Sequence, residues 1–294
     1  MGCVRLYLSK IDKCFSSSYW LRGLAALLIL SVVFRAPLLM KHLSKGFHMA
    51  RFELDYDWSD IEDPFADEKE ALKIFSQPFT YLGRGAQCYV FESCDQNYVV
   101  KIFQENRRAT PLSRWKGSLK RKKNTDFRSC LVAYSLAREE TALEYLHLHT
   151  TKARLPKLSV QSPTGQWFSL PLDRYSFALQ KKAKPFQETL IQASLEGNLA
   201  VYLSSFLSLI DSRLAKGIRN EDKSLLSNFG FLDQKAVEID FGRYLQSEVF
   251  LQPDMQRMEK KMFVDQLSIF LERELPHEIK TLETCLLQSE QSLS

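Results

Sequence analysis

The sequence predicts an α+β protein in which short antiparallel strands come first and helices dominate the second half. Residues 79–103 contain three short runs with apolar side chains at alternate positions, separated by turn residues, which is the pattern of half-buried strands. Residues 195–214 instead repeat apolar side chains at helical spacing, including Leu199, Leu203 and Phe206. The 294 residues are 45% hydrophobic and 26% charged, a composition typical of a folded globular protein.

The cysteine pattern and the charge exclude several classes of protein. None of the six cysteines forms a CxxC pair, and with only five histidines the ligand spacing of a zinc site is absent. Cysteines scattered in this way are typical of a reducing compartment rather than of a disulfide framework. The net charge of +5 does not indicate nucleic-acid binding, so no nucleic-acid partner is expected.

An apolar segment near the N-terminus predicts attachment to a membrane. Residues 23–34 carry no charge, and residues 20–40 are long enough to span a bilayer if Arg35 extends toward a head group. We therefore expect residues 1–45 to be a single membrane anchor, with the soluble domain in a reducing, cytosolic compartment. Two alternatives remain open: a cleaved signal peptide, or a core helix or over-long N-terminus with Met49 as the true start.

Two strongly charged stretches divide the remaining chain. Acidic residues crowd between Glu53 and Glu70, so residues 46–76 are predicted to be an acidic linker. A second stretch, the insertion at 104–126, contains a basic loop at 107–123 without acidic residues. This loop is suited to acidic lipid head groups, to an acidic protein partner or to the acidic linker itself, and a simple solvated loop is the alternative.

The first strands carry a pattern suited to phosphate binding. Gly83 and Gly85 lie at a strand–turn–strand junction, where glycines let the backbone approach a polyphosphate and offer it N–H groups. Val90 follows on the returning strand, and Lys101 lies within the apolar third strand, VVKIF. A lysine there can face bound phosphates as a point charge. A plain hairpin with one edge lysine is the alternative.

A second pattern, in the C-terminal half, is suited to a metal ion. Asn228 precedes one short predicted strand and Asp240 ends the next, with a turn at 233–234 between the two strands. The two side chains therefore bracket a small hairpin and can converge. Hard oxygen ligands in such an arrangement suit a Mg²⁺ ion that arrives with a nucleotide.

Taken in chain order, these segments resemble protein kinases. GRGAQCYVF and YVVKIF are similar to the glycine-rich loop and third-strand lysine of that superfamily, and Asp240-Phe241-Gly242 is similar to its metal-binding DFG segment. The resemblance covers roughly residues 79–245 and departs from the kinase pattern at Cys88, which replaces the third glycine of the loop. It implies a two-lobed kinase-like fold of the atypical, minimal bacterial type: an antiparallel-sheet N-lobe at 77–183 and a reduced helical C-lobe at 184–294.

The resemblance also implies site residues. Lys101, Gly83, Gly85 and Val90 would hold ATP, whose adenine would bind the backbone of the hinge between the lobes, while Asp240 and Asn228 would hold Mg²⁺. Residues 129–149 are predicted to form a helix.

Two further roles follow from the same resemblance. Glu139 in the predicted helix is expected to pair with Lys101, with Glu140 as a near-equal alternative. Asp222 is expected to act as the catalytic base, because Lys223 occupies the position of the kinase aspartate.

Three functions therefore remain in competition. The first is an ATP- and Mg²⁺-dependent phosphotransferase tethered to a membrane. The second is a catalytically inactive pseudokinase that acts as a membrane-associated binding scaffold, which Cys88 and Lys223 favour. The third is an unrelated α+β membrane protein in which the motifs occur by coincidence. Only a nucleotide site requires both Lys101 and Asp240, so their separation in the structure discriminates the third reading from the other two.

Overall fold

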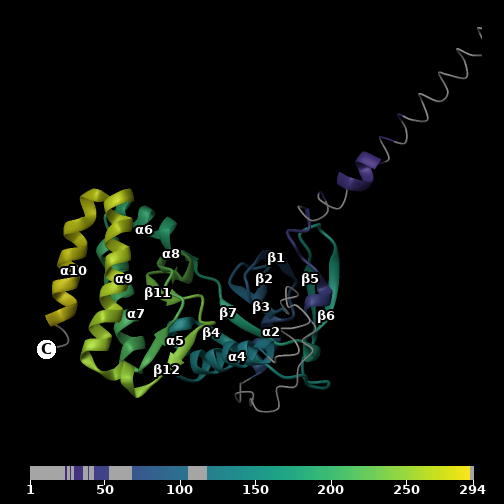
Figure 1. Cartoon of the computed structure of the whole chain (residues 1–294), viewed down its shortest axis with the longest axis horizontal. Coiled ribbons are helices and arrows are strands. Elements are labelled where there is room, and N and C mark those ends of the chain that lie inside the picture. Colours follow the sequence, from purple (N-terminus) through teal and green to yellow (C-terminus); the bar gives the residue numbers. More distant parts are fainter. Residues whose placement is uncertain are drawn as a thin grey trace, which may run out of the picture. The chain divides into compact units, whose positions relative to one another are not determined.

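A seven-stranded sheet is built from the first half of the folded unit, in the strand order β4-β7-β3-β2-β1-β5-β6 (Figure 1). All neighbouring strands in it are antiparallel except β1 and β5. Its strands are β1 (Phe79–Arg84), β2 (Cys88–Ser93), β3 (Tyr98–Phe103), β4 (Leu143–His147), β5 (Lys157–Gln161), β6 (Trp167–Pro171) and β7 (Phe177–Lys181). The predicted hairpin and third strand at residues 79–103 are thus confirmed.

The computed structural model describes residues 24, 27, 30–35, 39, 43–52, 68–104 and 118–291. The chain separates into two units, Met1–Phe47 and His48–Ser294, and everything below concerns the second. The predicted anchor at 20–40 falls largely on residues outside those described, as do the middle of the acidic linker and most of the basic loop at 107–123. Among the described residues, none of the helices has the length and apolar character needed to cross a membrane.

Both described ends of the predicted acidic linker belong to the folded unit. Phe52, which follows the short 3-10 helix Met49–Arg51, is fully buried against the rings of Tyr89, Phe91 and Tyr175. At the other end, the helix α2 (Glu68–Ile74) leads into buried Phe75, whose ring packs against Phe177. The aromatic side chains within the charged sequence therefore attach its two ends to the sheet.

The helix predicted at 129–149 is wrong at both ends. Helix α4 runs from Ser118 to Leu136, a short helix α5 spans Arg138–Thr141, and the remaining residues form strand β4. Ala142 has a left-handed backbone conformation with φ of 51° and ends α5. Leu143 and Leu146, which fit a helical face by spacing, instead pair with β7. Their packing on the sheet outweighs the helical spacing.

Helices and short strands make up the rest of the unit. The bounds are β8 (Lys184–Pro185), α6 (Phe186–Leu195), α7 (Leu199–Ala215), β9 (Ile218–Asn220), α8 (Leu225–Asn228), β10 (Phe229–Leu232), β11 (Lys235–Glu238), β12 (Tyr244–Gln246), α9 (Pro253–Glu274) and α10 (Ile279–Gln291). The hairpin predicted around residues 233–234 is confirmed as β10–β11. The sequence also predicts two terminal helices, at 264–275 and 277–287, and both are present as α9 and α10. Both of these helices are longer than the sequence indicated.

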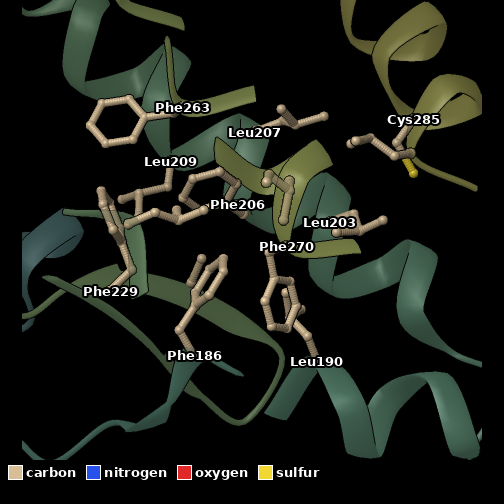
Figure 2. Packing of buried hydrophobic residues seen from close by; sticks show 14 of the residues in the cluster. Phe186, Leu190, Leu203, Phe206, Leu207, Leu209, Phe229, Phe263, Phe270 and Cys285 are labelled. Atoms are coloured by element: carbon tan, nitrogen blue, oxygen red, sulfur yellow. The ribbon is translucent and has the colours of Figure 1, made fainter. Parts of the chain in front are cut away.

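The apolar faces of these helices meet in one core (Figure 2). Phe206 of α7 contacts the rings of Phe186 and Phe229 edge-on, at centroid distances of 5.1 and 5.2 Å. Phe229 in turn meets Phe263 of α9 at 5.4 Å. This aromatic cluster packs α7 and α9 against the β10–β11 hairpin, which leads into the DFG segment.

The chain crosses from the sheet to the helices through residues 181–185. Strand β8 at the end of this crossing segment pairs with β10, so the small sheet has the order β11-β10-β8. Gly230 of β10 is buried directly beneath it. A Cβ atom at Gly230 would lie 2.6 Å from the Lys184 carbonyl oxygen and 2.9 Å from the Ala183 Cβ. The position therefore requires glycine for a close approach of two backbones.

The substitution Gly230→Ala should lower the free energy of unfolding by about 1–3 kcal/mol, because the added methyl must displace backbone atoms. Urea denaturation of the full chain measures the change. Gly83→Ala is the matched control, since a Cβ there meets nothing within 4 Å, and we expect a change within about 0.5 kcal/mol. Equal stability of the two variants would contradict this account of the crossing segment.

Candidate functional site

A cavity of about 610 Å³ lies between the β1–β2 hairpin, the crossing segment and the DFG segment. Five residues selected from the sequence line it: Gly85, Val90, Lys101, Asp222 and Asp240. They come from positions up to 155 residues apart in the sequence, so the fold itself brings them together. Gly83, Asn228 and Glu139 are not among its lining residues.

Lys101 is held close to the DFG segment. It pairs with Val90 on β2 and with Ala178 on β7, which fixes its position in the middle of the sheet. Its Nζ donates a hydrogen bond to the backbone carbonyl of Ile239, the residue before Asp240, and lies 5.1 Å from the centroid of the Phe241 ring. Lys101 and Asp240 therefore belong to one site, as a nucleotide site requires.

The glycine-containing turn is held by a glutamine that the sequence analysis did not select. Gln104 is 1% exposed, and its Nε2 donates to the carbonyl oxygens of Gly85 at 2.9 Å and Ala86 at 3.4 Å. Within the turn, the Gly85 N–H donates to the Cys88 carbonyl at 2.9 Å. A buried side chain thus fixes the turn although Cys88 replaces the third glycine. Because Gln104 follows the strand as an isolated polar residue, no sequence motif marks it.

Asp240 offers its carboxylate to the cavity, whereas Asn228 supports the loop around it. Asp240 Oδ1 accepts a hydrogen bond from the Gly242 N–H at 3.1 Å. The Asn228 side chain donates to the Asp222 carbonyl at 3.1 Å, and its Oδ1 accepts from Ser227 at 3.0 Å. The backbone carbonyl of Asn228 accepts from the Ile239 N–H at 2.6 Å. Asn228 therefore lies next to the metal-binding candidate, with its side chain engaged in holding the loop.

Asp222 and its neighbour Lys223 point to different partners. Asp222 lines the cavity, and its Oδ1 also accepts from the Ser224 N–H at 3.3 Å. Lys223 lies 3.1 Å from the buried carboxylate of Glu259 on α9. The lysine that occupies the kinase aspartate position is therefore engaged elsewhere, and the aspartate one residue earlier faces the cavity.

The expected ion pair between Lys101 and Glu139 does not form. Glu139 has an 86% exposed side chain and lies 3.7 Å from Lys235. The alternative, Glu140, is buried and bonds to Ser212 at 2.5 Å and to Lys216. Both glutamates lie on α5, beyond the end of α4, so the misplaced helix boundary accounts for the failure.

The acidic residue of α4 that reaches toward the site is Asp126. It is buried, and it accepts a hydrogen bond from Gln87 Nε2 at 3.2 Å. Gln87 belongs to the glycine-containing turn and lines the cavity, and the same Nε2 lies 3.5 Å from the Gly242 carbonyl. Gln87 thus joins the turn, α4 and the DFG segment. Asp126 was missed because it lies in the sequence of the predicted basic insertion.

A buried charged network supports the floor of the cavity. Arg213 of α7 is fully buried, and its Nη1 donates to both carboxylate oxygens of Glu238 on β11, at 2.8 and 2.7 Å. Glu238 also accepts from Asn220 at 2.7 Å and from the Tyr244 hydroxyl at 2.6 Å. Asn220 Nδ2 reaches the backbone carbonyl of Asp240 as well, at 2.9 Å. The network therefore connects α7, β9, β11 and β12 directly to the DFG segment.

Burial and neighbouring charges shift the pKa values of this network. Burial and the Glu238 carboxylate raise the pKa of the Tyr244 phenol well above its usual range, although Arg213 opposes the shift. Burial lowers the pKa of the Arg213 guanidinium, but the attraction of Glu238 outweighs it and the pKa is raised overall. Arg213 thus stays charged and Tyr244 stays protonated in the folded protein, which keeps the hydrogen bonds to Glu238 intact.

A second cavity, of about 1000 Å³, lies on the other side of the crossing segment. Its lining includes charged residues that are already paired, such as Lys181 with Glu144 at 3.3 Å and Lys235 with Glu139. Among the site residues predicted from the sequence, only Glu139 lines this larger cavity. The smaller cavity is therefore the candidate site. In the described part of the chain, no group of three or more His, Cys, Asp or Glu side chains is suited to hold a metal ion by itself.

Comparison with solved structures finds similar chains, all at low sequence identity. A crystal structure of WbdD has a TM-score of 0.39 and 15% identity, and the alignment covers 73% of this chain and 46% of WbdD. A second structure, described as the bifunctional kinase-methyltransferase WbdD, has a TM-score of 0.37 and 14% identity over 70% of this chain and 43% of that one. WaaP in complex with acyl carrier protein has a TM-score of 0.34 and 10% identity, covering 77% of this chain and 91% of WaaP.

The fold is α+β, with an antiparallel-rich sheet in its first part and helices in its second part. The chain spans less than half of the WbdD chains it matches. No protein-family model matches the sequence, and no curated protein matches it either. The elements on which the resemblance rests lie around one cavity: a glycine hairpin, a lysine on the third strand, a crossing segment and a DFG segment.

Removing one partner of the Arg213–Glu238 pair should be strongly destabilising. We expect Arg213→Met to lower the free energy of unfolding by about 3–5 kcal/mol, because it leaves the Glu238 carboxylate buried without its cation. The double variant Arg213→Met/Glu238→Leu should lose less than the sum of the two single variants. Denaturant titration of the full chain gives all three values.

The matched control is Arg257→Ala, which removes an exposed ion pair with Asp254 at 2.6 Å. It should change the free energy of unfolding by less than about 0.5 kcal/mol. If Arg213→Met cost no more than this control, the buried network would not be the support of the cavity floor.

Proposed function

We propose that this chain is an ATP- and Mg²⁺-dependent phosphotransferase that uses the cavity of about 610 Å³. The observation that carries the proposal is the placement of Lys101, Asp222 and Asp240 around one cavity, with Lys101 bonded to the residue before Asp240. A cation for phosphates, a carboxylate for metal and a second carboxylate for the acceptor are the groups that phosphoryl transfer requires. The glycine-containing turn provides a surface for the polyphosphate.

The residues present fit a magnesium ion that arrives with the nucleotide. Mg²⁺ in nucleotide sites is held by one or two carboxylates together with phosphate oxygens and water, so a dedicated cage of protein ligands is not required. Asp240 would be its main protein ligand, and Asn228 would hold the adjoining loop. When bound, Mg²⁺ would neutralise charge on the phosphates.

In the proposed reaction, Asp222 accepts the proton of an acceptor hydroxyl as its oxygen bonds to the γ-phosphorus. The bond between the γ-phosphorus and the bridging oxygen breaks, and ADP leaves with the electron pair. Lys101 stays on the phosphates, and its hydrogen bond to the Ile239 carbonyl keeps its ammonium group close to Asp240. Positioning and charge neutralisation supply most of the rate enhancement.

The second candidate is a pseudokinase scaffold. Lys101 lacks the expected glutamate partner, Cys88 stands in place of the third glycine, and Lys223 is paired with Glu259. These departures favour loss of transfer activity with the fold retained. Nucleotide binding and turnover therefore have to be measured separately.

Membrane attachment through residues 20–40 remains part of the proposal. The apolar sequence of this segment supports it, and the basic loop at 107–123 is suited to anionic head groups or to an acidic protein partner. Flotation of the full chain with anionic vesicles, compared with a chain that begins at Met49, tests both elements.

ATP together with Mg²⁺ should raise the thermal unfolding temperature of the full chain. A ligand at a hundredfold excess over its Kd stabilises the folded state by roughly 2.7 kcal/mol. The shift should need Mg²⁺ and should disappear in Asp240→Ala, whereas the exposed control Asp254→Ala should keep it. Absence of any shift at millimolar ATP would contradict the proposed nucleotide site.

The catalytic role of Asp222 is tested by turnover. Asp222→Asn should lower kcat by about 10²–10⁴-fold, because the variant can no longer take the acceptor proton, and should leave the KM for ATP unchanged. Glu221→Gln alters the exposed neighbour and should retain full activity. The readout is ATP hydrolysis or transfer to an added hydroxyl acceptor. An active Asp222→Asn variant would refute the assignment, and a stable nucleotide complex without turnover in the wild type would favour the scaffold.

A further inference from the structure

A buried glutamine, Gln180, directly precedes the crossing segment and lines the cavity. Gln180, near the end of β7, is 1% exposed and lines the cavity. It pairs with Val99 on β3, whereas Lys101 pairs with Ala178 two residues earlier on β7. Two strand residues span roughly 7 Å, so Gln180 is displaced by that length from the lysine toward the crossing segment. In the proposed nucleotide site the phosphates would lie next to Lys101, which would leave Gln180 next to the base.

The hydrogen bonds of Gln180 fix which way its amide points. Nε2 donates to the backbone carbonyl of Thr141 at 2.6 Å and lies 3.5 Å from that of Glu238. Turning the amide over would place Oε1 against these two carbonyl oxygens, and two acceptors repel each other. The nitrogen is therefore used inside the protein. Within the described part of the chain, Oε1 accepts no hydrogen bond, and it belongs to a side chain that lines the cavity.

A backbone donor lies next to this acceptor. Ala183, three residues further along, lines the same cavity, and its N–H donates to none of the residues that the structure describes. The preceding N–H groups are both engaged, Lys181 with the Ala142 carbonyl at 3.0 Å and Lys182 with the Asn97 carbonyl at 2.8 Å. This end of the cavity thus has a side-chain acceptor, Gln180 Oε1, beside a backbone donor, the Ala183 N–H.

We infer that Gln180 is a specificity-determining residue that reads the 6-amino group of adenine through Oε1. Adenine has an amino donor at C6 beside an acceptor at N1, which complements an acceptor from Gln180 and a donor from Ala183. Guanine has a carbonyl oxygen at C6, and this oxygen would meet Oε1 as a second acceptor. An unpaired buried acceptor costs affinity, so a nucleotide without the amine is disfavoured. The inference rests on the proposed nucleotide site and adds the basis of its selectivity.

The test compares ATP with purine riboside triphosphate, which has hydrogen in place of the 6-amino group. Calorimetric titration of the full chain in Mg²⁺ should give a Kd about tenfold lower for ATP. In Gln180→Met, a side chain of similar length without an acceptor, the ratio of the two Kd values should fall toward one. Leu82→Ala, which changes an apolar residue of the same cavity, should alter both Kd values and preserve their ratio.

The outcomes separate this inference from the proposed function. Equal affinity of the wild type for the two nucleotides, or a full preference that persists in Gln180→Met, would overturn the role of Gln180 and leave the nucleotide site standing. Absence of binding by either nucleotide would overturn both. Should Gln180→Met not fold, Gln180→Leu takes its place, because it also lacks an acceptor: a lost preference supports the inference, and a preference that persists overturns it.

Discussion

The buried bond between Arg213 and Glu238 is the constraint on which the site depends. Both side chains are fully removed from solvent, and Glu238 also takes hydrogen bonds from Asn220 and Tyr244. Removing one member of such a network leaves a buried charge or polar group without its partner, so the four residues hold one another in a single arrangement. Asp240 follows Glu238 by two residues, and Asp222 follows Asn220 by two. The network therefore sets the positions of the two carboxylates that face the cavity.

The remaining walls of the cavity depend on packing and on backbone geometry. Gln104 fixes the glycine-containing turn from beneath, and Gly230 allows the crossing segment to lie directly on β10. On the helical side, the rings around Phe206 and Phe229 attach the β10–β11 hairpin to α7 and α9 (Figure 2). These supports lie outside the site itself, yet each sets the position of an element that lines it.

Local residue patterns predicted those parts of the fold in which the conformation that neighbouring residues favour is also the one they adopt in the structure. The strands predicted from the alternation in residues 79–103 and the pair of short strands around residues 233–234 both appear as expected. Lys101 and Asp240 were found because each lies within a recognisable motif. The boundary of α4 could not be predicted, since Leu143 and Leu146 fit a helix by spacing and their pairing with β7 is a tertiary effect. The role expected of Glu139 failed with that boundary.

The roles of residues that act through long-range contacts could not be predicted from the sequence, for a similar reason. Gln87, Gln104 and Gln180 are isolated polar residues without a motif, and each acquires its role only when distant backbone comes within hydrogen-bond distance. Arg213 likewise appears in the sequence as one charge on an otherwise apolar helix. Its partner Glu238 is 25 residues away and lies on a strand. A sequence pattern does not reveal such pairs, whereas their burial in the structure does.

The most direct test of the central claim is a crystal structure of the full chain with a non-hydrolysable ATP analogue and Mn²⁺. The account predicts an anomalous peak for Mn²⁺ beside the Asp240 carboxylate, phosphates next to Lys101 and the base between Val99 and the crossing segment. An analogue bound outside this cavity, or a metal peak remote from Asp240, would contradict it.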